Sequence, residues 1–203
     1  MKGSPKSGRR SYRLGRRAEA SGQTRQRIVE ATFELHSERG IADTSMKDIA
    51  ERAGVSVGTV YHHFPTYADT IVACGAYTAE QAPAPTAAIF AGAAGRGARI
   101  ARLARALFDY YERVPALESV RRDRQLTPEL DAFAREEARN RRRLAAEAVG
   151  TAGATALAAA LLDIDVYRSL RREGFGTADA ADRIAETITL AVDNLRTGAA
   201  RRS

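Results

Sequence analysis

Apolar side chains recur at intervals of three and four residues along most of this 203-residue chain. That spacing places side chains on one face of an α-helix, whereas a half-buried strand needs a strict alternation of apolar and polar residues, which this sequence lacks. Alanine and arginine, which favour helices, are abundant. The sequence therefore predicts an all-α protein.

Two features divide the chain into three expected segments. The first 17 residues carry seven Lys and Arg residues and no acid, which equals the formal net charge of +7 of the whole chain. We expect a disordered basic arm over residues 1–22, which either contacts a polyanion such as DNA or serves only as a solubilising leader. Further on, Pro83 and Pro85 interrupt helix formation because proline lacks a backbone N–H. We therefore expect a small domain over residues 23–81 and a larger helical domain over residues 82–203.

Capping residues, glycines and prolines set the expected bounds of the helices. The strongest start is Thr127-Pro128-Glu129, with a capping hydroxyl, a proline at the first position and an acid in the first turn. The expected helices cover residues 24–39, 46–53, 57–63, 66–81, 98–113, 115–124, 127–149, 154–172 and 177–196.

The segment over residues 44–64 predicts two short helices joined by a sharp turn. Ser45 is placed to cap the first helix, with Asp48 three residues later as in a capping box. Gly54 supplies the positive φ that ends this helix, and Ser56 caps the next one. In a helix-turn-helix, the first residues of the second helix enter the major groove of DNA. The alternative is an ordinary helical hairpin without a DNA-binding role.

Over residues 24–77 the sequence resembles the TetR family of regulators. The matching strings are Arg27-Ile28-Val29-Glu30-Ala31, Gly40-Ile41, Thr44-Ser45, Asp48-Ile49-Ala50, Ala53-Gly54-Val55-Ser56 and Gly58-Thr59-Val60-Tyr61-His62-His63-Phe64. The resemblance implies a homodimer with an N-terminal three-helix helix-turn-helix DNA-binding domain. It also implies a C-terminal helical domain for dimerisation and for binding a small-molecule effector.

The sequence departs from the family pattern at two positions. His36 stands where the family often has phenylalanine, and we expect it to be a packing residue with a hydrogen-bond partner rather than a sensor. Thr66-Tyr67 stands where the family often has a phosphate-binding lysine, so one fixed charge is lost there.

The resemblance, carried over position by position, implies two kinds of DNA contact. Phosphate contacts orient the domain, and contacts to base edges specify the sequence. The implied phosphate contacts are Ser45, Ser56, Tyr61, His63 and Tyr67, and the implied base readers are Val57, Gly58, Thr59 and His62. Arg25 and Lys47 are further candidates for backbone contacts, with a plain solvated charge as the alternative for each.

Apolar and aromatic residues of the body suggest a dimer interface and an effector site. The two last helices carry apolar stripes that would be buried between two copies of the chain, or else within one chain; the candidates are Leu157, Leu161, Ile184, Ile188, Val192 and Leu195. The candidate walls of an effector site, for which ordinary core packing is the alternative, are Phe90, Leu103, Leu107, Phe108, Tyr110, Tyr111, Phe133 and Tyr167.

Other function classes find little support in the sequence. The three histidines are His36, His62 and His63, and no catalytic, phosphate-loop or metal-binding spacing is present, so we expect neither an enzyme nor a cofactor or metal. No apolar run is long enough for a membrane span or a secretory signal, and the single Cys74 suits a reducing compartment, so we expect a cytoplasmic protein. The predicted function is a repressor that a small molecule releases from a pseudo-palindromic operator. A ligand-independent dimeric DNA-binding protein is the alternative.

Overall fold

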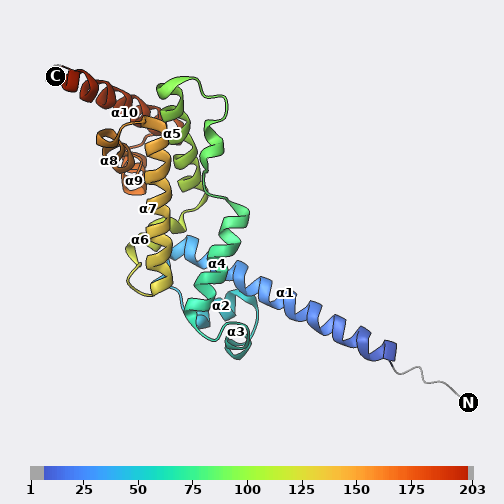
Figure 1. The fold of residues 1–203 in the computed structure, drawn as a ribbon. Coiled ribbons are helices and arrows are strands. Elements are labelled where there is room, and N and C mark those ends of the chain that lie inside the picture. Colours follow the sequence, from blue (N-terminus) through green and yellow to red (C-terminus); the bar gives the residue numbers. More distant parts are fainter. Residues whose placement is uncertain (1–6, 201–203) are drawn as a thin grey trace, which may run out of the picture. The chain divides into compact units, whose positions relative to one another are not determined.

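The computed structural model describes the backbone of residues 7–200 and the side chains of residues 18–195. In this part of the chain every regular element is helical, which confirms the all-α prediction (Figure 1). The elements are α1 (Ser7–Arg39), α2 (Met46–Ala53), α3 (Val57–His63), α4 (Tyr67–Gln81), the 3-10 turn η1 (Ala87–Phe90), α5 (Gly95–Arg113), α6 (Ala116–Arg122), α7 (Pro128–Val149), α8 (Ala152–Leu161), α9 (Ile164–Arg172) and α10 (Thr177–Ala200).

The chain forms two compact units, Met1–Tyr77 and Thr78–Ser203. The division falls inside α4, N-terminal to the break over residues 82–85 that the prolines predict. Each unit has its own apolar core.

Helix α1 is longer than the sequence analysis predicts. It begins at Ser7, so the start expected at Thr24 and the disorder expected over residues 7–22 are wrong; residues 1–6 of the expected arm lie outside the described part of the chain. Residues 18–23 are all exposed, so no packing within the unit holds them helical. The sequence is compatible with the extension because no proline stands between residues 7 and 39 to stop the helix, and five residues of the added segment are arginines, which favour helices.

The first unit packs α1, α2 and α3 around one small core. Ile28 and Leu35 of α1 meet Ile49 of α2 there, and Val60 and Phe64 close the core from α3 and its C-terminal cap. Val60 and Ile49 are fully buried. This packing fixes which side of α3 faces inward and therefore which side faces solvent.

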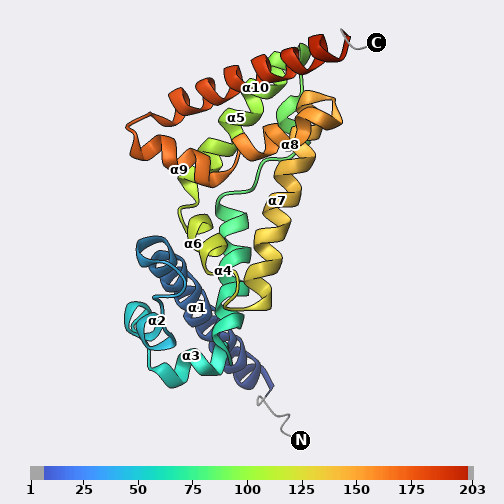
Figure 2. The ribbon, with the colours of Figure 1, turned by 90° about the vertical axis from the view of Figure 1, so that its left-hand side faces the viewer.

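The second unit is built on α5 and α10, which run side by side (Figure 2). Ile184, Ile188 and Val192 of α10 lie in the same buried cluster as the residues of α5. At its centre the Phe108 and Tyr167 rings lie 4.8 Å apart. Helices α7 and α8 also pack against each other, and α8 in turn contacts α10.

A single helix expected over residues 154–172 is in fact two helices, α8 and α9, separated at Leu162 and Asp163. The Asp163 carboxylate caps α9 by accepting a hydrogen bond from the backbone N–H of Asp165 at 3.0 Å. The same carboxylate pairs with Arg141 of α7 at 2.7 Å, and the Arg141 side chain is only 9% exposed. The expectation was wrong because apolar spacing does not register a buried arginine that requires a nearby counter-ion.

Candidate nucleic-acid interface

Helices α2 and α3 have the bounds that the sequence predicts, and their caps explain why. The backbone N–H of Ser45 donates to the Asp48 carboxylate, and its hydroxyl accepts from the Asp48 N–H, which together form a capping box. Gly54 has φ 66°, a left-handed conformation that ends α2, and Ser56 caps α3 by accepting from the Thr59 N–H at 3.1 Å. The two helices are therefore joined by a short, locally determined turn.

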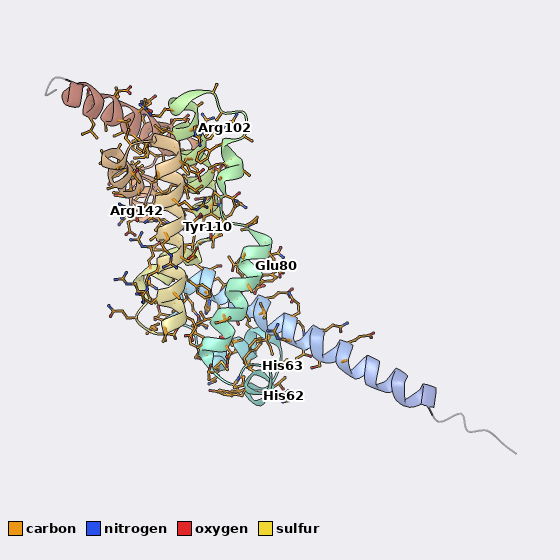
Figure 3. All side chains as sticks on the ribbon, viewed as in Figure 1. His62, His63, Glu80, Arg102, Tyr110 and Arg142 are labelled. Atoms are coloured by element: carbon orange, nitrogen blue, oxygen red, sulfur yellow. The ribbon has the colours of Figure 1, made fainter. Side chains whose placement is uncertain are left out.

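The outer face of α3 carries most of the side chains predicted to contact DNA. Val57 is 37% exposed and Tyr61 is 50% exposed, whereas Val60 on the opposite face is fully buried. Ser56, Gly58 and His62 are also exposed, and Figure 3 shows His62 and His63 together on α3. This arrangement places a short row of side chains and a bare backbone position on the exposed side of α3.

Thr59 and Ser45 are less available than their sequence positions suggest. The hydroxyls of Thr59 and Ser56 lie 2.8 Å apart, and Thr59 is half-buried. The Ser45 hydroxyl donates to Asp48 within the cap. Lys47, on the first turn of α2, is exposed. Among these candidates, Lys47 therefore offers a charged group that the caps do not occupy.

Tyr67 has a different role from the phosphate contact that the resemblance implies. Its hydroxyl donates to the Ile41 carbonyl oxygen at 2.7 Å and lies 2.9 Å from Nε2 of His36. A phenol has one proton, and here that proton is directed to Ile41, so the hydroxyl has none to give to a phosphate. In this structure the Tyr67 hydroxyl is thus engaged within the unit, which favours a structural role in holding the buried His36; His36 has the packing role expected of it.

Positive charge and a perturbed histidine lie at the C-terminal end of α3. The Arg25 guanidinium lies 4.8 Å from the centre of the Phe64 ring, which places a cation of α1 beside α3. Partial burial, together with the neighbouring charges of His62 and Arg25, lowers the pKa of His63 below its ordinary value of 6.5. His63 is therefore mainly neutral near pH 7. By contrast, Arg52 is bound to Glu34 and Glu38 and adds no free charge.

The aromatic residues proposed as effector walls form packed core in the second unit. Leu103, Leu107, Phe108, Tyr111 and Tyr167 are buried, Tyr110 packs against them, and Phe133 is 37% exposed. The cavity that adjoins Tyr111, between α5, α6 and α7, has a volume of about 10 Å³. That is about the space of one water molecule. The structure thus favours the core interpretation for the buried residues, Phe90 included, whereas Phe133 lies at the surface.

The predicted dimer stripe also divides into two groups. Ile184, Ile188 and Val192 pack inside one chain, so assigning them to an interface between chains was wrong. Leu157 and Leu195 are 41% and 49% exposed, and Leu161 is half-buried.

The exposed residues of α8 point to an apolar surface that the sequence analysis did not isolate. The helix has no charged residue, and its exposed positions are Ala152, Gly153, Ala156, Leu157 and Ala160. On α10, which contacts α8, Leu190 is 66% exposed. We call these residues of α8, with Leu190 and Leu195, the α8/α10 face.

Known proteins are similar to the helix-turn-helix segment of the first unit. Residues 28–69 match the family model described as bacterial regulatory proteins, tetR family. The HTH-type transcriptional repressor KstR of Mycolicibacterium smegmatis (strain ATCC 700084 / mc(2)155) is 40% identical over 55 residues, which cover 27% of this chain and 27% of KstR. The chain thus spans about a quarter of the length of this curated relative.

Solved structures resemble a larger part of the fold. A tetR-family transcriptional regulator from Streptomyces coelicolor matches with a TM-score of 0.64 and 18% identity, over 86% of this chain and 82% of that one. The multidrug binding protein EbrR, solved in complex with malachite green, matches with a TM-score of 0.57 and 23% identity, over 81% of this chain and 95% of that one. At these identities the likeness establishes the fold. No helix in the described part of the chain is long and apolar enough to cross a membrane.

Proposed function

We propose that the chain is a dimeric transcriptional regulator that binds operator DNA through α3, on the premise that residues 28–69, which match the model of tetR-family regulatory proteins, act as such a domain. The observation that carries the proposal is the exposed outer face of α3, held by a capped helix pair whose opposite face is buried. In a helix-turn-helix this second helix is the one that enters the major groove.

Base recognition by α3 would be sparse. The Val57 side chain has no hydrogen-bonding group and offers only apolar contact to a thymine methyl. Gly58 has no side chain and allows the backbone to approach the bases closely. His62 is exposed and offers ring nitrogens that hydrogen-bond to base edges. We therefore propose that Val57, Gly58 and His62 set the sequence preference, while Ser56, Tyr61 and Lys47 contact phosphates.

We propose that a second copy of this chain covers the α8/α10 face. A stable interface needs an apolar centre, and α8 supplies an uncharged surface while Leu157, Leu190 and Leu195 supply large side chains. Two reading heads about 34–36 Å apart would then enter successive major grooves of a pseudo-palindromic operator.

The dimer is tested by the double substitution Leu157→Glu and Leu190→Glu. It buries two charges at the proposed centre, so sedimentation velocity should find monomers. Leu126→Glu is the control, because Leu126 is 55% exposed and lies outside the α8/α10 face; this variant should remain dimeric. A dimer that survives the double substitution would refute this interface.

We further propose that the regulator is a repressor, as KstR is named, and that a small molecule releases it from DNA. EbrR, which shares the fold, is a multidrug binding protein. The cavity beside Tyr111 is too small for such a ligand, so binding there would require α6, whose Leu117 and Val120 line the cavity, to move. The coupling between ligand and DNA is reciprocal: the factor by which the ligand weakens DNA binding equals the factor by which DNA weakens ligand binding. A ligand-independent DNA-binding dimer is the alternative.

Operator selection from random duplex DNA, followed by fluorescence anisotropy, tests the function. The protein should enrich a pseudo-palindrome and prefer it to bulk competitor DNA at moderate salt. Tyr61→Ala should weaken binding to all sequences alike, whereas His62→Ala should alter which bases are preferred. A protein without preference for any duplex over competitor would overturn the proposal.

A further inference from the structure

The second unit contains a charged cleft lined by none of the residues that we propose for DNA binding or dimerisation. It lies where the C-terminal end of α5, helix α6 and helix α9 meet, and its volume is about 550 Å³. This volume is within the range of small-molecule sites, which run from about 300 to 1,000 Å³. The residues that line it are Glu112, Glu118, Asp165, Arg168, Arg171 and Arg172.

Helix α9 contributes three arginines to one side of this cleft. Arg168, Arg171 and Arg172 are at positions i, i+3 and i+4, which lie on one helix face. Three like charges at such spacing repel one another, so this face gains stability from any anion that lies against it.

The carboxylates across the cleft neutralise these arginines incompletely. The closest contacts are 3.6 Å between Arg168 Nε and Glu118 Oε2, and 3.6 Å between Arg171 Nη2 and Glu112 Oε1. Both distances exceed the usual hydrogen-bond range, which extends to about 3.2 Å. The Nε atom of Arg168 is buried and makes no hydrogen bond within the described part of the chain. A buried N–H of a charged group without an acceptor is costly, so the charge of Arg168 is poorly compensated within the chain. Its side chain is 26% exposed, so a ligand can reach the guanidinium from the cleft.

Arg172 is the second under-used cation. Among the described side chains no carboxylate lies within ion-pair distance of it, and its Nε donates only to the Arg168 carbonyl oxygen at 3.4 Å. The acids of the cleft are occupied by other groups: Glu112 accepts a hydrogen bond from the Tyr167 hydroxyl, and Asp165 pairs with Arg121 at 3.2 Å. The groups left to bind a ligand are therefore the guanidinium groups of Arg168 and Arg172.

We propose that this cleft binds a small-molecule oxyanion, through a carboxylate or phosphate group held by Arg168 and Arg172. Guanidinium groups present several N–H donors in a planar fork that matches the oxygen geometry of both anions. The site lies within the second unit, and its occupation does not depend on whether α3 binds DNA.

Isothermal titration calorimetry on the full chain tests the site, with citrate and inorganic phosphate as separate probes and sodium chloride at matched ionic strength as the blank. At least one probe should bind saturably. Binding of citrate alone assigns the site to carboxylates, and binding of phosphate alone assigns it to phosphate groups. The absence of saturable binding for both probes would overturn the proposal.

Two variants with opposite expected effects separate the site from general charge effects. Arg172→Gln should weaken binding by about tenfold, because it removes a charge-assisted hydrogen bond. Glu118→Gln should tighten binding by roughly threefold, because it removes a carboxylate that competes for Arg168. Arg183→Gln is the matched control, because Arg183 lies on α10 outside the cleft and its side chain is 65% exposed. This variant should bind the probe with unchanged affinity. Equal losses for Arg172→Gln and Arg183→Gln, or weaker binding by Glu118→Gln, would refute the assignment.

Discussion

Replacing Tyr67 with phenylalanine separates a structural role of this residue from a DNA contact. The substitution removes one oxygen, which donates to the Ile41 carbonyl at 2.7 Å and lies 2.9 Å from Nε2 of His36. Each such hydrogen bond contributes a net ~0.5–1.5 kcal/mol, so the loss of both should destabilise the first unit by about 1–3 kcal/mol. The ring itself stays in place, so packing against the core should be largely kept.

The measurement is the free energy of unfolding in urea, followed by far-UV circular dichroism, together with operator affinity under conditions where both proteins are folded. Tyr67→Phe should lower stability and leave affinity nearly unchanged. Tyr61→Phe is the matched control, because Tyr61 is 50% exposed on α3; it should leave stability unchanged and weaken DNA binding. If Tyr67→Phe kept full stability but lost affinity, the hydroxyl would be a phosphate donor and our assignment would be wrong.

Three further predictions concern the buried ion pair, a histidine and a turn. Arg141→Ala should destabilise the protein by roughly 3–5 kcal/mol in urea, because it removes the ion-pair partner of the largely buried Glu137 and leaves Asp163 with Arg121 alone. Arg139→Ala, whose side chain is 65% exposed, should cost at most about 1 kcal/mol. Folding lowers the pKa of His63, so the unfolded chain takes up a proton at a higher pH than the folded chain. The melting temperature should therefore fall as the pH drops below 6.5, and it should fall less steeply in His63→Gln. Equal slopes for the two proteins would contradict this. Gly54→Ala should cost roughly 1 kcal/mol in urea from its φ of 66° alone, since an added Cβ meets no atom within 4 Å; an unchanged stability would show that the turn adapts.

The sequence predicted best what local chemistry determines. The bounds of α2 and α3 follow from Ser45, Gly54 and Ser56, whose caps need only neighbouring residues. The start of α1 was missed because its first residues, rich in arginine, glycine and serine, carry no periodic apolar face to mark where the helix begins. The break before α9 was missed because Asp163 acts there through Arg141, which is distant in sequence.

Apolar periodicity predicted least where the same spacing occurs on buried helix faces and on exposed ones. Ile188 and Leu157 both belong to apolar stripes, yet Ile188 is buried against α5 and Leu157 is 41% exposed. Spacing shows that a helix has an apolar face, and only the packed structure shows whether the same chain covers it. The role of Tyr67 was missed for a related reason, since its acceptor Ile41 and its neighbour His36 come from another helix and its following turn.

The two ion pairs of Asp163 position α9 independently of the exposed surface of α8. Arg141 and Arg121 both pair with this residue, so the direction in which α9 leaves is set by groups that lie outside the α8/α10 face. The exposed residues of α8 take no part in these ion pairs, because α8 has no charged residue. Substitutions of the outward alanines and leucines of α8 can therefore change the surface that we propose for pairing without redirecting the helix that follows.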